Sequence, residues 1–393
     1  MRKSFTCKVV ALLIIFMLIF TLVGCGGNSA EQQPEEKIEP IKIGIVGSKT
    51  GPLNAYHKQF MRGLELGLEH VTGGTKKIAD REILFFEEDD ESKADVAKQK
   101  AIKLLEEDEV DFIVGVESST NAIAVAPLAE EYKKIFIIDP AVADGIIGAS
   151  WNKYIFKSGR SSGQDAAASA AAIAKPGVKI ATLGQDNAFG RDGCAAFKRE
   201  AEKLGATVIH EEYVPTTATD FTPNLMKIVD SKPEYLWIVW AGTLTPWQQI
   251  ADLKITDKGI KLSSGVPDQA ALPFMDKAVG MIGMCVYHPN LPQSAEARKV
   301  HDWLVEEHQK RFDGEMPDLF TPSGYNVISA IKTAVEKNNG STNADELIPI
   351  MEGMSFPTPK GTFTFRKEDH LALQPLYVVE LVMGKEMPEP KLI

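Results

Sequence analysis

The sequence has few cysteines, no long apolar run after its first 23 residues and none of the common hydrolase motifs. Only Cys194 and Cys285 lie beyond residue 25, and their spacing suits no metal site. Outside the cell these two thiols could form a disulfide, but free thiols fit the sequence equally well. Neither H-E-x-x-H nor G-x-S-x-G occurs, and the seven histidines are scattered. We therefore expect no catalytic activity, no cofactor and no metal.

Positive charge is also scarce. The 393 residues include 43 Lys and Arg against 54 Asp and Glu, and Met1–Gly24 contributes three of the basic residues and no acid, so the remainder has a formal charge of −14. This balance argues against nucleic acid or an anionic membrane surface as a partner. The length exceeds that of a usual single core, so two domains are expected.

The N-terminus has the pattern of a secretion signal. Basic residues in Met1–Lys8 precede an apolar stretch of 15 residues at Val9–Val23, which is short for a spanning helix. The tetrapeptide Leu-Val-Gly-Cys then ends at Cys25 and resembles a bacterial lipobox, in which the cysteine sulfur receives a diacylglycerol. The alternatives are an uncleaved anchor and a chance cysteine after an ordinary signal.

The lipobox implies three N-terminal features. Residues 1–24 would be a lipoprotein signal peptide, Cys25 the lipidated residue, and residues 25–40 a polar, flexible tether. Lipid chains would hold the protein on the outer side of the cytoplasmic membrane, at the cell surface or in the periplasm.

The rest of the chain is organised around Asp111–Ala143. Phe112–Val114 and Ile135–Ile138 are short apolar runs typical of buried strands, and hydroxyl residues at Ser118–Thr120 begin a helix between them. In such a βαβ unit the ligand site lies beyond the carboxyl ends of the strands. The free N–H groups of the helix start suit a carboxylate. Two roles for Ser119 stay open, as a helix cap and as a ligand contact.

Strand–helix alternation occurs twice. It fills residues 41–157 and starts again at Val178, which predicts an α/β protein with two doubly wound lobes. The helices predicted at 295–312, 323–337 and 343–354 have no matching strands, so they are expected to complete a lobe that began earlier.

Three short segments have motif-like patterns. GSKTG at residues 47–51 fails the phosphate-loop pattern because Ser48 stands where glycine is needed. The acidic run Glu87–Ser92 is interpreted as a strand end followed by helix-capping acids rather than as a metal cluster. Ser162-x-x-Asp165 is expected to form a capping box at the start of a helix.

Five stretches, in order along the chain, resemble the leucine/isoleucine/valine-binding type of ABC-transporter solute-binding protein. They are IKIGIVGSKTGPLNAY, FIVGVESSTNAIAVAPLAEEY, YIFKSGRSSGQDA, GQDNAFGRDGCAAFKREAEKLGATVIHEEYVPTTATDF and GTFTFRKEDHLALQPLYVVEL. The resemblance implies the type I periplasmic binding protein fold, in which two Rossmann-like lobes joined by three crossovers close on a small solute. It also implies a monomer that delivers its solute to ABC permease subunits.

The crossovers are expected near Ser158, His288 and Gly361. Lobe 1 would then comprise residues 41–157 plus 289–360, and lobe 2 residues 158–288 plus 361–393.

Four positions take a ligand-binding role from the resemblance. Ser119 matches a serine that holds the ligand carboxylate or amine, and the neighbouring Ser118 lies at the same helix start. Tyr56 and Phe189 match aromatic walls of the cleft, and Thr243 matches a ligand-facing position in lobe 2.

Two departures from the amino-acid binders count against an α-amino acid as the ligand. The loop after the fourth strand has Ala141, Val142 and Ala143, so a threonine hydroxyl of the family is missing. The lobe 2 acid that meets the ammonium falls near Pro267, and Asp268 replaces it only with a shift of one residue. An ammonium left unpaired in a closed cleft is costly.

Arg160 and two tryptophans complete the candidates. Arg160, near the first crossover, either clamps a carboxylate or forms a hinge salt bridge. Trp240 and Trp247 either stack on an apolar ligand or belong to the core.

The function expected from the sequence is capture of an amino acid, amide or carboxylate for an ABC importer. A binding module that feeds a sensor kinase or chemoreceptor is the first alternative, and a surface α/β hydrolase the second.

Overall fold

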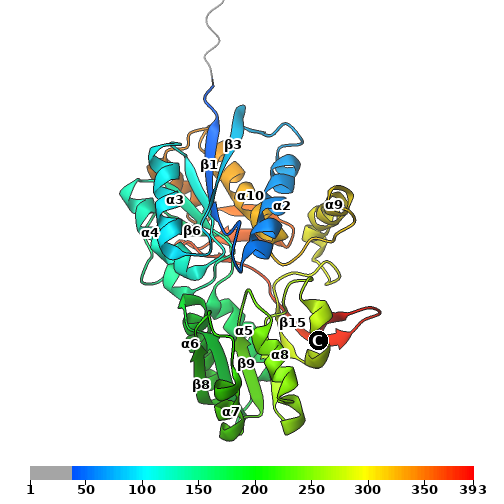
Figure 1. The fold of residues 1–393 in the computed structure, drawn as a ribbon. Helices are drawn as coiled ribbons and strands as arrows, with labels where there is room; N and C mark the ends of the chain where they lie inside the picture. The colour runs from blue at the N-terminus through cyan, green and yellow to red at the C-terminus, as the bar shows by residue number, and fades with distance from the viewer. Residues whose placement is uncertain (1–37) are drawn as a thin grey trace, which may run out of the picture. The chain divides into compact units, whose positions relative to one another are not determined.

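The computed structural model describes residues 38–393, and residues 39–393 form one unit that holds both lobes (Figure 1). The expected signal peptide, the lipid site at Cys25 and tether residues 25–37 lie outside the described residues. No helix within residues 38–393 has the length and apolar character needed to cross a membrane.

The first lobe is built on a six-stranded sheet in the order β2-β3-β1-β4-β5-β6. All strands but the short β2 run parallel. β4 and β5 are buried at every position, which explains their continuous apolar runs. The chain leaves β1 toward β3 and returns to β4 on the other side, so a topological switch point lies between β1 and β4. The strands are β1 (Ile41–Gly47), β2 (Lys77–Ile78), β3 (Arg81–Asp89), β4 (Phe112–Gly115), β5 (Ile135–Ile138) and β6 (Ile155–Lys157).

Helices from distant parts of the chain share the core of this lobe. The late helix α10 packs against α2 so closely that a Cβ at Gly63 would lie 1.8 Å from the Thr321 carbonyl oxygen. Two of the three late helices, α10 and α11, contribute residues to this core, which leads us to propose that the late region completes this lobe. The helices are α2 (Asn54–Val71), α3 (Ala94–Glu106), α4 (Ser119–Glu131), η1 (Asp144–Ile146), α9 (Ala295–Arg311), α10 (Thr321–Lys337) and α11 (Ala344–Met351).

The second lobe has a parallel sheet in the order β10-β9-β7-β8, with a switch point between β7 and β9. A three-stranded antiparallel sheet, β11-β15-β16, adjoins it through a bridge between Gly265 and Met284. The strands are β7 (Lys179–Gln185), β8 (Thr207–Val214), β9 (Tyr235–Val239), β10 (Lys261–Ser264), β11 (Ile282–Cys285), β15 (Tyr377–Met383) and β16 (Pro388–Leu392). The helices are α5 (Ser162–Ile173), α6 (Ala188–Lys203), α7 (Thr222–Ser231), α8 (Thr245–Asp252), η2 (Thr256–Lys258), η3 (Leu272–Phe274) and η4 (Asp276–Ala278).

A small antiparallel sheet lies where the third crossover is expected. It consists of β12 (Ser355–Thr358), β13 (Gly361–Phe365) and β14 (Ala372–Leu373). Phe363 and Phe365 of β13 belong to the core cluster of the first lobe. The sequence analysis places the third crossover before β13, at Gly361, but this packing leads us to propose that the crossing follows β14.

Two details of the sequence analysis need correction. The capping box of α5 is formed by Ser161 and Gln164, one position earlier than expected. The acids after β3 do not cap α3, whose N-cap is Lys93, which makes no side-chain cap bond. The structure also settles the open question on the cysteines, because Cys194 and Cys285 are both buried free thiols.

Candidate ligand-binding cleft

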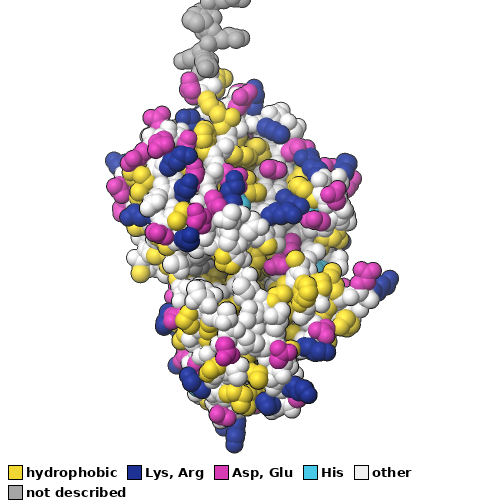
Figure 2. All heavy atoms as spheres, viewed as in Figure 1, with side chains coloured by type: hydrophobic (Ala, Val, Ile, Leu, Met, Phe, Trp, Pro, Cys, Tyr) yellow, Lys and Arg dark blue, Asp and Glu magenta, His cyan; other side chains and the backbone are white. Residues whose placement is uncertain are grey.

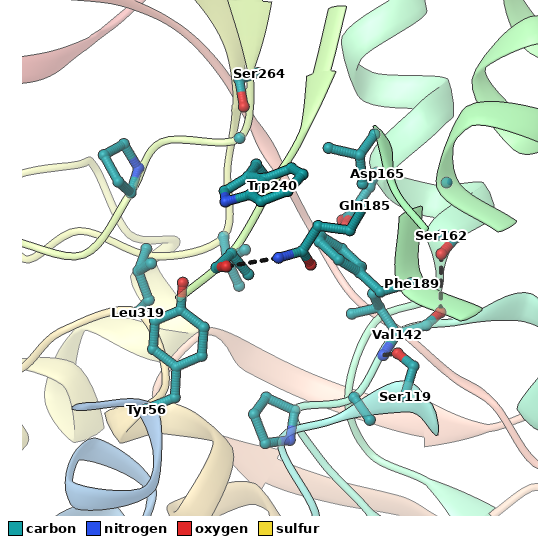
Figure 3. Close-up of a pocket in the computed structure, with 18 of the residues that line it drawn as sticks. Tyr56, Ser119, Val142, Ser162, Asp165, Gln185, Phe189, Trp240, Ser264 and Leu319 are labelled. Carbon is teal, nitrogen blue, oxygen red and sulfur yellow. Dashed lines mark hydrogen bonds between the residues drawn. The ribbon is translucent and has the colours of Figure 1, made fainter. Parts of the chain in front are cut away.

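A cavity of about 140 Å³ lies between the two lobes, at the carboxyl ends of strands from both parallel sheets. Residues 117–119, 140–142 and 160 follow first-lobe strands, and residues 185–189, 240–241 and 264–267 follow or end second-lobe strands. The surface is hollowed at this level (Figure 2), and side chains from both lobes reach into the space (Figure 3). Ligands of doubly wound folds bind at this edge of the sheet.

Ser119 has a fixed hydrogen-bonding role in this cavity. Its Oγ accepts the backbone N–H groups of Val142 and Ala143, each at 3.1 Å, so it ties the start of α4 to the loop after β5. The helix cap is instead Ser118, which accepts the N–H of Asn121. A serine hydroxyl has two lone pairs and one hydrogen, so the Ser119 O–H remains free to donate.

Arg160 places a guanidinium beside the first crossover. Its Nε donates to Asp165 Oδ1 at 2.8 Å, and the residue is 8% exposed. Its guanidinium carbon lies 5.7 Å from the ring centre of Phe320. Among the described residues no hydrogen bond engages the two terminal nitrogens, which therefore remain available on a side chain that lines the cavity. The salt-bridge alternative is present, and it uses only one edge of the fork, so the other edge is left for the clamp that the sequence analysis proposes.

Aromatic rings form much of the remaining wall. Tyr56, from the start of α2, extends into the cavity and packs edge-on against Phe320 at a centroid distance of 4.6 Å (Figure 3). Burial and the charge of Asp268 raise the pKa of the Tyr56 phenol, so it stays protonated. Trp240 approaches from the loop after β9, and Phe189 from the start of α6. Such a wall suits an apolar or aromatic ligand body.

Glu117 is the acid in the turn between β4 and α4, and its side chain is fully buried. It accepts the Ser48 N–H at 2.8 Å and contacts His57 Nδ1 at 3.0 Å, while the other ring nitrogen of His57 lies 2.8 Å from Glu87. Burial lowers the pKa of His57, but the hydrogen bonds to the two carboxylates outweigh it and raise the pKa to about 9. At neutral pH His57 is therefore a cation that neutralises Glu117.

A cluster of buried charges lies behind the cavity. Lys157 is fully buried, and its Nζ donates to the Ala141 carbonyl. Burial lowers the pKa of Lys157, and likewise that of Lys360, to about 7. Burial raises the pKa of Asp139, which the Lys157 ammonium opposes. A buried pair of this kind responds to any new charge placed nearby.

Most of the residues expected at the site line the cavity. They are Ser118, Ser119, Tyr56, Ala141, Val142, Phe189, Arg160 and Trp247. Ala143, Thr243 and Asp268 do not. Ala143 contributes its N–H to Ser119, and Thr243 accepts the indole N–H of Trp240 at 3.1 Å. Asp268 Oδ1 accepts the Ala271 N–H at 3.0 Å and so stabilises its own turn.

Other lining residues escaped the sequence analysis. They include Gln185, whose amide donates to the Ala241 carbonyl at 2.8 Å, and Phe320 at the start of α10. Gln185 lies in the loop expected at residues 184–190, directly after a predicted strand at 178–183, so its position beyond a strand's carboxyl end was the available indication; in the structure it is the last residue of β7. Phe320 lies in the late helical region, and nothing in the local sequence connects it with the cleft. Trp240, for which stacking and core roles were both open, lines the cavity.

Two doubly wound lobes around a cleft of this kind define the type I class of solute-binding proteins. Residues 40–386 match the family described as "Periplasmic binding protein", and the chain belongs to this family. It is a solute-binding protein of the ABC-transporter kind.

Three similar proteins place the chain within the family. "Leu/Ile/Val-binding protein homolog 6" of Brucella suis is 24% identical over 361 residues, which is 88% of each chain. A solved structure of an ABC-type branched-chain amino acid transporter from Rhodopseudomonas palustris is 44% identical, with a TM-score of 0.77, and covers 90% of this chain and 95% of its own. A solute-binding protein from Rhodopseudomonas palustris BisB5, in complex with 3,4-dihydroxybenzoic acid, is 26% identical, with a TM-score of 0.79 and coverages of 90% and 96%.

Proposed function

We propose that this protein is the solute-binding lipoprotein of an ABC importer and that it captures a small organic carboxylate between its lobes. The observation that carries the proposal is the pairing of donors around one cavity. The free O–H of Ser119 and the two terminal nitrogens of Arg160 belong to residues that line it from the first lobe and the first crossover. A planar fork and a hydroxyl are a suitable pair for a carboxylate.

Two relatives support this ligand class. The 44% identical structure is named for branched-chain amino acids, and the 26% identical structure holds 3,4-dihydroxybenzoic acid. Both kinds of molecule carry a carboxylate. The aromatic wall of Tyr56, Phe189 and Trp240 would cover the apolar part.

Capture would proceed by closure of the lobes about the crossovers. The ligand supplies contacts to both sheets, so it favours the closed form over the open one. Micromolar affinity corresponds to about 8 kcal/mol, which a charge-assisted pair and a buried apolar body can provide. Acylation at Cys25 would keep the protein at the membrane, next to the permease.

The test is a thermal-shift screen in which each acid is paired with its neutral amide. We expect aliphatic or aromatic carboxylates to raise the melting temperature and their amides to leave it nearly unchanged. A ligand at 100 times its Kd adds about 2.7 kcal/mol of stability, which such a screen detects. Equal shifts for an acid and its amide would contradict a carboxylate-specific cleft. Small-angle scattering with the best ligand should show compaction, and unchanged dimensions at saturation would contradict closure.

A further inference from the structure

We infer that the cleft selects carboxylates that carry no ammonium group, because its free charged group is the Arg160 guanidinium fork while the acids that line it are already paired. The inference rests on the proposed function and narrows its ligand class. The question is which acceptors or anions of the cavity could bind the ammonium group of a zwitterionic ligand.

Several hydrogen-bond donors at the cavity have no partner in the protein. Ser119 Oγ accepts two backbone N–H groups, so only its hydrogen is left for a ligand. The two terminal nitrogens of Arg160 also have no hydrogen bond among the described residues. At the second-lobe side the indole N–H of Trp237 is buried without a partner. All of these groups require an acceptor from the ligand.

Three backbone carbonyls at the cavity are occupied. The carbonyl of Ala141 accepts a hydrogen bond from Nζ of the buried Lys157. The carbonyl of Val142 accepts both the N–H and the hydroxyl of Ser162, at 2.7 and 3.2 Å (Figure 3). On the opposite wall the Ala241 carbonyl accepts the Gln185 amide. A ligand ammonium would have to displace one of these donors.

The two acids that line the cavity are paired. The Glu117 carboxylate accepts the Ser48 N–H with one oxygen and contacts the ring of His57 with the other, and its side chain has no exposed surface. Asp165 is held by Arg160 at 2.8 Å, and its side chain is 10% exposed. Neither carboxylate can approach a ligand cation without leaving a buried charge uncompensated.

The acids on the far side of Tyr56 are engaged as well. Asp268 accepts the Ala271 N–H. Asp318 accepts the side-chain amide of Gln59 at 3.0 Å and the backbone N–H of Gln269 at 2.9 Å. Neither lines the cavity.

The acceptors that remain at the cavity are neutral, among them the carboxamide oxygen of Gln185 and the buried hydroxyl of Ser169, which have no hydrogen bond among the described residues. They can take a hydroxyl or amide hydrogen but cannot balance an ammonium. With the Arg160 guanidinium lining the same cavity, a buried ammonium would be both unpaired and repelled.

The experiment compares acids that differ from an amino acid only by the ammonium. Calorimetric titrations at pH 7.5 and fixed salt would use 4-methylpentanoate against leucine, and 3-phenylpropanoate against phenylalanine. The amines 3-methylbutylamine and 2-phenylethylamine serve as controls. We expect the acid of at least one pair to bind about ten-fold or more tightly than its amino acid, and neither amine to bind.

Three results would overturn the inference. Leucine or phenylalanine binding more tightly than its deaminated acid would refute it while leaving solute capture intact. Binding of an amine would refute it and the carboxylate proposal together. No binding by either acid at millimolar concentration would refute both as well, since the pair spans an aliphatic and an aromatic body.

Variants of Arg160 distinguish a direct contact of its guanidinium with the ligand from a general loss of protein stability. Arg160→Gln should weaken binding of the acid about ten-fold or more, and Arg160→Lys, which keeps the charge, by less. Arg191→Gln is the matched control, because Arg191 pairs with Asp186 at an exposed position outside the cavity. If Arg160→Gln and Arg160→Lys both fold and both retain wild-type affinity, the fork does not hold the carboxylate and the inference fails.

Discussion

His57 lies between two carboxylates, and we predict that its charge makes the free energy of unfolding depend on pH even without a ligand. The imidazole is 5% exposed and lies between Glu117, which is fully buried, and Glu87. Its pKa rises from an ordinary value of 6.5 to about 9 on folding. Such a rise corresponds to roughly 3 kcal/mol of stability. The lowered pKa of Glu87 reflects its bond to the same ring, so it adds nothing further.

The pH window follows from the direction of this change. Between about pH 6.5 and 9 the folded protein holds a proton on His57 that the unfolded chain has released. Stability from this group is therefore complete below pH 6.5 and disappears as the pH rises through about 9. His57→Gln removes the titrating group but leaves a polar side chain of similar size.

Urea unfolding of the wild type and His57→Gln at pH 6, 7.5 and 9 measures this contribution. We expect the wild-type advantage to be greatest at pH 6 and to shrink by roughly 2–3 kcal/mol toward pH 9. His210→Gln is the matched control, since His210 contacts Glu212 at 2.8 Å with its side chain 28% exposed, where ion pairs contribute little. A wild-type advantage that does not change with pH would refute the charged state assigned to His57.

Four further outcomes are expected. Ser119→Gly should weaken carboxylate binding by about 1–3 kcal/mol in calorimetry, since the free donor is lost and the helix cap is another residue; unchanged affinity would exclude it from the site. Binding of an acid should take up protons near pH 7, because a new negative charge raises the pKa of Lys157 and Lys360 from about 7; affinity that rises with pH would contradict this. Gly63→Ala should lower stability by about 1–3 kcal/mol in urea unfolding, because the new Cβ meets backbone. Cys25→Ser should release the mature protein from membranes, and sedimentation of this variant after a salt wash would favour an uncleaved anchor.

Local sequence was sufficient for the elements that position the cleft. Phe112–Val114 and Ile135–Ile138 are short and wholly apolar, and hydroxyl residues lie between them at Ser118–Thr120, so both strands and the helix start were predictable. β10 was missed, because Leu262 is the one apolar residue of Lys261–Ser264 and the strand owes its burial to its neighbours in the sheet.

The polarity of the site was not predictable from local sequence. A shift of one residue in the start of α4 decides whether Ser118 or Ser119 caps the helix. The two N–H groups that donate to the Ser119 hydroxyl come from a loop that begins 23 residues later in the chain. His57 and Glu117 are 60 residues apart, and only the parallel pairing of β1 with β4 brings their ends together. Long-range pairing therefore determines which polar groups of the cleft remain free.

The crystal structure of the protein with the tightest-binding carboxylate tests the central claim most directly. The account predicts closed lobes, with the carboxylate oxygens within about 3.2 Å of Ser119 Oγ and of the terminal nitrogens of Arg160, and no acidic side chain against the ligand. A carboxylate bound elsewhere, or a ligand ammonium held by Glu117 or Asp165, would contradict it.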